Sequence, residues 1–140
     1  MTKVSVLIAD DERFAREELK HQLSVYPELL LVGEADNGIE AVKTIKELRP
    51  DLLFLDIEMP GLKGIEVIEA LSSMPDYRPF IVIVTAYENY AVKAFEYDVL
   101  DYLLKPVDTK RLATTMSRVL KYTSGQQCIN RIAAKRLNRM

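Results

Sequence analysis

The chain has 140 residues, of which 49% are hydrophobic, and a formal net charge of −2 at neutral pH. This length fits one domain, and the apolar content is ample for a sizeable core. A single cysteine, Cys128, excludes an intramolecular disulfide, and no apolar stretch approaches the length of a membrane span. We therefore expect a soluble, cytoplasmic protein with no membrane association.

The charge is divided unevenly along the chain. Residues 1–120 carry a balance of −7, whereas residues 121–140 contain five basic and no acidic residues. We expect residues 1–122 to form the domain and residues 123–140 to form a basic linker or tail. A basic tail can contact nucleic acid, but a linker to an output domain absent from this chain is the favoured interpretation.

Short apolar runs alternate with amphipathic helical patterns along the domain. Strands are predicted over residues 4–9, 29–32, 52–55, 80–84 and 102–104. Helical patterns lie roughly over residues 12–25, 39–49, 65–74, 90–95 and 109–120, the last with Asp108 or Thr109 as its N-cap. This (βα)5 order predicts an α/β fold with a doubly wound, parallel five-stranded sheet.

Polar side chains follow four of the predicted strands. In chain order these strand ends are Asp10-Asp11, Asp56, Thr85-Ala86 and Lys105-Pro106. Each has an ordinary explanation, such as a helix cap for Asp10 or Asp11 and a loop acid for Asp56. In parallel sheets, however, ligands gather outside the carboxyl ends of the strands. The coincidence of all four at one edge therefore predicts a common site.

The chemistry of this predicted site favours phosphoryl transfer. Three carboxylates at one edge repel one another unless a cation neutralises them, and such hard oxygen ligands suit Mg²⁺. A carboxylate can also act as a nucleophile and form an aspartyl phosphate, whose charge an ammonium and a hydroxyl group stabilise. No histidine nucleophile is required, and the one histidine, His21, is expected to face solvent on the first helix.

These segments resemble the receiver domain of two-component response regulators over about residues 3–121. The matching segments are IADDE at 8–12, LLFLDIEMPGLKG at 52–64, VTA at 84–86 and DYLLKPV at 101–107. The resemblance implies a flavodoxin-like sheet of strand order 2-1-3-4-5, with residues 1–122 as the receiver domain. It also implies a phosphoacceptor that catalyses its own phosphorylation and dephosphorylation, and not an enzyme in the usual sense.

The resemblance implies a role for each acidic residue of the site. Asp56 would be the phosphoacceptor, which receives its phosphoryl group from a sensor histidine kinase. Asp11 would bind Mg²⁺ directly and Asp10 mainly through water, together with Asp56 and the backbone carbonyl of Glu58.

Further roles are implied for residues after the last two strands. Thr85 would donate a hydrogen bond to a phosphoryl oxygen, Lys105 would pair with it, and the small side chain of Ala86 would leave room for it. Tyr102 would swing inward as Thr85 moves. The peptide bond between Lys105 and Pro106 would be cis, a rare form even before proline.

The segment 86–108 further resembles the receivers of LytTR-type (LytR/AlgR-like) regulators, which implies a DNA-binding output domain and a role in transcription regulation. Phosphorylation would then switch the face formed by the fourth helix, fifth strand and fifth helix, and would promote a homodimer. Tyr97 is expected to be exposed on that face. Alternatively, the aromatic residues of this segment line an ordinary half-buried helix, namely Tyr87, Tyr90, Phe95 and Tyr97. A stand-alone receiver that acts through protein contacts remains an alternative.

Two other classes of function compete with a receiver. An aspartyl-nucleophile phosphohydrolase would use an acid two residues after its nucleophile, and Glu58 stands there. The chain has no cap insertion to enclose a substrate, however, and the Asp10-Asp11 pair fits a receiver better. A pseudo-receiver without phosphorylation is disfavoured because the acidic residues, Thr85 and Lys105 are all present.

Overall fold

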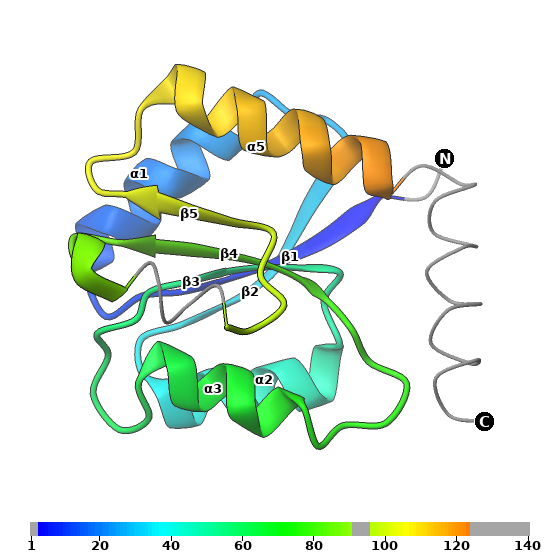
Figure 1. The fold of residues 1–140 in the computed structure, drawn as a ribbon. Helices are drawn as coiled ribbons and strands as arrows, with labels where there is room; N and C mark the ends of the chain where they lie inside the picture. Colours follow the sequence, from blue (N-terminus) through cyan, green and yellow to red (C-terminus); the bar gives the residue numbers. More distant parts are fainter. Residues whose placement is uncertain (1–2, 91–95, 124–140) are drawn as a thin grey trace.

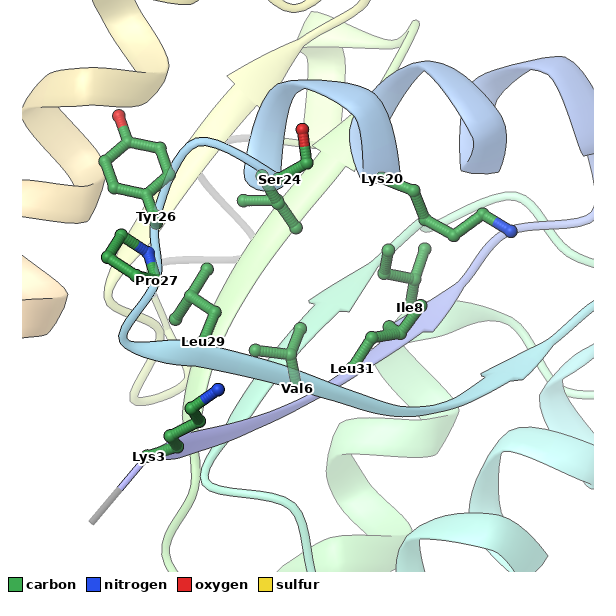
Figure 2. A pocket seen from close by; sticks show the side chains of 10 residues that line it. Lys3, Val6, Ile8, Lys20, Ser24, Tyr26, Pro27, Leu29 and Leu31 are labelled. Carbon is green, nitrogen blue, oxygen red and sulfur yellow. The ribbon is translucent and has the colours of Figure 1, made fainter. Parts of the chain in front are cut away.

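The computed structural model describes residues 3–90 and 96–123, which form a parallel five-stranded sheet with helices on both faces (Figure 1). The strands are β1 (Val4–Ala9), β2 (Leu29–Ala35), β3 (Leu52–Leu55), β4 (Phe80–Thr85) and β5 (Asp101–Leu104). The helices are α1 (Arg13–Leu23), α2 (Gly38–Leu48), α3 (Gly64–Leu71) and α5 (Thr109–Tyr122), with a short 3-10 helix η1 (Glu88–Tyr90). The strand order β2-β1-β3-β4-β5 and the parallel pairing confirm the predicted doubly wound fold.

The continuous apolar runs are explained by burial on both faces of the sheet. Helices α1 and α5 cover one face, and α2 and α3 cover the other (Figure 1). Side chains of β3 alternate between the two cores: Leu53 lies under α2 and α3, whereas Phe54 lies under α1 and α5. All four β3 residues are buried, and each such side chain contributes about 1.5–3 kcal/mol relative to exposure.

Two helix starts are capped by polar side chains. The Asn37 side chain accepts a hydrogen bond from the Glu40 amide at 2.8 Å. Asp108, and not Thr109, is the N-cap of α5, and it accepts from the Arg111 amide at 3.0 Å. Helix α1 differs, because its N-cap is Glu12 and the Glu12 side chain makes no capping bond.

A register shift makes β2 longer than the apolar run that predicted it. The pairing of β1 with β2 shifts between Val6 and Leu7, and Val32 has no partner in the register. Beyond this bulge the side chain of Glu34 faces α1, where it forms ion pairs with Arg16 at 3.2 Å and Lys20 at 3.0 Å. The bulge thus re-aims one acidic side chain toward the helix.

The structure confirms the predicted exposure of His21 but not that of Tyr97. His21 is exposed, as expected. The prediction that Tyr97 is exposed is wrong: its ring packs against the core under α2 and α3, and its hydroxyl donates to Glu69 at 2.8 Å. Most of the predicted fourth helix falls on residues 91–95, which lie outside the described residues, as does nearly all of the predicted tail at 123–140. Among the described residues, no helix is both long and apolar enough to cross a membrane.

Candidate functional site

The carboxyl ends of β1 and β3 lie side by side and fix two carboxylates. The Asp10 amide donates to the Ala35 carbonyl at 3.0 Å, and the Asp56 amide donates to the Ala9 carbonyl at 2.9 Å. Backbone hydrogen bonding therefore extends one residue past each strand. Asp10 and Asp56 are each only 4% exposed, so their side chains have little freedom to move away from each other.

Two glycines hold the loop that follows Asp56. The Gly64 amide donates to the Ile57 carbonyl at 2.8 Å, and the Gly38 amide donates to the Pro60 carbonyl at 3.1 Å. A Cβ atom on Gly64 would lie 2.4 Å from the Asp56 carbonyl oxygen, closer than real Cβ contacts come. Glycine at this position lets the start of α3 pack directly against the backbone that carries the Asp56 side chain.

Three carboxylates form an acidic cluster at this edge of the sheet. Asp10, Asp11 and Asp56 each offer one oxygen atom, and these atoms lie within 4.8 Å of one another. Burial raises the pKa of Asp10 above its ordinary value, and the charge of Asp56 adds to this effect. Hydrogen bonds from Lys105 and from the Glu12 amide oppose the rise but do not cancel it. The cluster is thus a set of hard oxygen ligands suited to a divalent cation.

Lys105 places an ammonium group against the same cluster. Its Nζ lies 2.7 Å from Asp10 Oδ2, 2.9 Å from Glu12 Oε1 and 2.9 Å from Asp56 Oδ2. Burial by itself would lower the pKa of Lys105, but hydrogen bonds to these three carboxylates outweigh it and raise the pKa above its ordinary value. Lys105 is therefore positively charged throughout the physiological pH range. The Lys105–Pro106 peptide bond is cis.

The end of β4 and the side chain of Tyr102 complete this edge. Thr85 is fully buried, and its Oγ1 accepts a weak hydrogen bond from the Tyr87 amide at 3.4 Å. The Lys105 amide donates to the Thr85 carbonyl at 2.8 Å, which joins the ends of β4 and β5. The half-buried Tyr102 donates its hydroxyl to the Tyr87 carbonyl. Tyr102 thereby links β5 to the loop after β4.

An open cleft of about 580 Å³ lies over these strand ends. The loops after β1, β3, β4 and β5 all contribute to its wall, including Asp11, Asp56, Ala86 and Lys105. The Asp10 and Thr85 side chains are buried at the same edge. The structure thus brings the predicted strand-end residues to one place. The carboxylates of Asp10 and Asp56 contact Lys105 directly, and Thr85 is set more deeply.

Sequence reasoning missed two residues that contact this site. Glu12 stands within the IADDE segment but received no role, and it forms an ion pair with Lys105. Arg16 donates from Nη1 to the Asp10 carbonyl at 2.7 Å and fixes the backbone of the β1–α1 loop. Lys105 lies 93 residues from Glu12, so no local spacing in the sequence signals their contact.

The fold and this edge together define a receiver-type signalling domain, in which carboxylates, a hydroxyl group and a lysine surround the end of the central strand. Comparison with known families agrees. Residues 6–117 match the family model of the response regulator receiver domain, and the chain belongs to that family.

Three similar proteins are regulatory proteins or domains by name. The chain is 51% identical over 118 residues to a response regulatory protein of Vibrio cholerae, covering 84% of this chain and 49% of that protein. It is 46% identical over 123 residues to the transcriptional regulatory protein BtsR of Escherichia coli, covering 88% and 51%. The response regulatory domain of mrkE from Klebsiella pneumoniae has a TM-score of 0.78 at 32% identity, covering 84% and 95%. The chain spans about half the length of these two curated relatives.

Proposed function

We propose that this domain is the phosphorylation-dependent input of a two-component response regulator, and that Asp56 accepts a phosphoryl group from a sensor histidine kinase. One observation carries the proposal. The Asp56 carboxylate is held at the end of a fully buried strand, 2.9 Å from the Lys105 ammonium and within 4.8 Å of two further carboxylates. The side chain is thus anchored through its backbone while its carboxylate borders an open cleft.

In the proposed reaction an Asp56 carboxylate oxygen attacks the phosphorus atom of the donor. An acyl phosphate bond forms as the bond from phosphorus to the donor's nitrogen or oxygen breaks, and the leaving group takes the electron pair. The Lys105 ammonium stabilises negative charge on a phosphoryl oxygen, and Thr85 offers a hydroxyl donor after a small shift toward the cleft. The domain holds the phosphoryl group as a signal and does not turn over an external substrate.

A divalent cation, which we propose to be Mg²⁺, fits the acidic cluster. The residues that would hold it are Asp10, Asp11, Asp56 and the backbone carbonyl of Glu58, all oxygen donors of the kind that this ion prefers. When bound, the ion supplies positive charge against the carboxylates and the incoming phosphoryl oxygens. Burial, and to a lesser extent the charge of Asp56, raises the pKa of Asp10, and a bound cation would oppose both effects.

Labelling with a small phosphodonor tests the proposed reaction. Incubation with Mg²⁺ and acetyl phosphate should yield an acid-stable, base-labile adduct with a mass increase of one phosphoryl group. Asp56→Asn should abolish this adduct, whereas Asp51→Asn, at the opposite end of the same strand, should leave it intact. A wild-type protein that does not label, or an Asp56→Asn variant that labels equally, would exclude the assignment.

The finer output assignment is also a proposal. We propose a LytTR-type regulator in which residues 1–122 are the receiver and residues 123–140 lead to a DNA-binding output domain. The likeness of segment 86–108 to LytTR-type receivers supports this, as do the name and greater length of the Escherichia coli transcriptional regulatory protein. The bond from Tyr102 to the Tyr87 carbonyl offers a route from the cleft to the face of β5 and α5.

A homodimer through that face would carry the signal to the output domain. Sedimentation of the wild-type protein should show a larger dimer fraction after addition of Mg²⁺ and beryllofluoride, a phosphoryl mimic. Unchanged sedimentation together with clear beryllofluoride binding would exclude this dimer, and would favour a receiver that signals through contacts with other proteins.

A further inference from the structure

Glu12 uses its carboxylate in an unusual way for a helix N-cap. Its backbone is extended, with φ −92° and ψ 115°, and its side chain makes no hydrogen bond to its own helix. N-cap side chains usually accept from the first-turn amides. The Glu12 carboxylate instead contacts the Lys105 ammonium at 2.9 Å, across the cleft from its own loop.

This contact occupies one of the donors of Lys105. An ammonium group carries three N–H donors, and the three carboxylates of Asp10, Glu12 and Asp56 all lie within 2.9 Å of Nζ. A phosphoryl oxygen added to Asp56 needs one of these donors. The phosphoryl oxygens on Asp56 therefore compete for Lys105 with the carboxylates that already contact it.

The three carboxylates differ greatly in how firmly they are held. Side-chain exposure is 6% for Asp10 and 5% for Asp56 but 64% for Glu12. Asp10 accepts a second hydrogen bond from the Glu12 amide at 2.9 Å, and Asp56 accepts one from the Glu58 amide at 3.3 Å. Glu12 has a longer side chain and solvent at hand, so its release costs least.

We propose that Glu12 is a positioning residue that occupies a donor of Lys105 in the unphosphorylated domain and yields that donor to a phosphoryl oxygen. The inference rests on the proposed function, because it concerns regulation of the same site. Phosphorylation brings about −1.5 to −2 charges close to Lys105, which repel the Glu12 carboxylate as they replace it. Glu12 thus holds the ammonium over the cleft and at the same time competes with the phosphoryl group.

Removal of this competitor should strengthen binding of a phosphoryl mimic. Glu12→Gln and Glu12→Ala should bind beryllofluoride with Mg²⁺ about two- to five-fold more tightly than wild type, the range expected for an exposed ion pair. Glu18→Gln is the matched control, since it removes the same charge from the exposed side of α1 and its Oε1 atom accepts from Gln22 at 3.5 Å. The dissociation constants can be measured by fluorine NMR.

A second readout does not depend on phosphorylation. The ammonium signal of Lys105 in nitrogen-edited NMR spectra, assigned by its absence from Lys105→Arg, should shift in metal-free Glu12→Ala and stay unchanged in Glu18→Gln. With saturating Mg²⁺ and beryllofluoride, the Lys105 ammonium signal should be the same in wild type and in Glu12→Ala. The ammonium signal reports directly on the contact between Glu12 and Lys105. If Glu12 only stabilised its own loop, its removal would leave this signal unchanged.

The outcomes separate the two proposals. If wild type binds no beryllofluoride, the proposed function fails and the exchange at Lys105 fails with it. If wild type binds it but the Glu12 variants match Glu18→Gln, or bind more weakly, the exchange proposal alone is overturned. A structure of the beryllofluoride complex in which Glu12 still contacts Lys105 would also refute it.

Discussion

Replacement of Gly64 by alanine tests whether close packing at the start of α3 holds Asp56 in place. The added Cβ would lie 2.4 Å from the Asp56 carbonyl oxygen and 2.8 Å from Ile57 Cα. Both neighbours are backbone atoms, so they can yield only if the loop or the helix moves. Overpacking of this kind typically costs 1–3 kcal/mol, while alanine gains up to about 1 kcal/mol in helix propensity. We expect a net loss of about 1–2 kcal/mol in the free energy of unfolding.

Gly33→Ala is the matched control for this substitution. Its added Cβ would meet the side-chain ends of Leu48, Leu7 and Thr44, each at 3.3 Å, and such atoms can give way. Urea unfolding of both variants measures the difference in the free energy of unfolding, and acetyl phosphate labelling reports on Asp56. We expect Gly64→Ala to be clearly less stable than Gly33→Ala and to label more slowly. Equal stability of the two variants would show that the loop after β3 yields easily and does not fix Asp56.

Three further predictions concern stability and metal binding. Tyr77→Phe should lower the free energy of unfolding by about 1 kcal/mol, measured by urea unfolding, because the buried Tyr77 hydroxyl donates to the Pro50 carbonyl at 2.6 Å; a change below 0.3 kcal/mol would contradict this. Burial by itself would raise the pKa of Asp101, but hydrogen bonds from Arg111 and Thr115 outweigh it and lower the pKa below 3.8. The free energy of unfolding that wild type gains over Asp101→Asn should therefore be complete above pH 3.8. This gain should fade as the pH falls through the lowered pKa of Asp101 in the folded state. A constant difference between the two proteins down to about pH 2 would refute this. Mg²⁺ at ten times its dissociation constant should raise the free energy of unfolding by about 1.4 kcal/mol, and this gain should be lost in Asp11→Asn and on chelation; an equal gain in the variant would remove Asp11 from the metal site.

The fold could be predicted well because its signals are local. The run Leu52–Leu55 indicated a strand buried on both faces, and Asp108 was one of the two N-caps predicted for the last helix. Prediction failed where a distant partner decides the local structure. The second half of β2 follows a bulge, and the exposure of Tyr97 depends on a core built by α2 and α3 and on Glu69.

The sequence by itself determined which chemical groups stand at the strand ends, because strand, turn and helix patterns place Asp10, Asp11, Asp56, Thr85 and Lys105 there. Tertiary structure alone decided which of these charged groups contact one another. Lys105 meets three carboxylates because parallel pairing brings β1 and β3 together and the Thr85 carbonyl ties down the end of β5. Glu12 enters the site for the same reason, because its carboxylate contacts an ammonium group 93 residues away in the sequence.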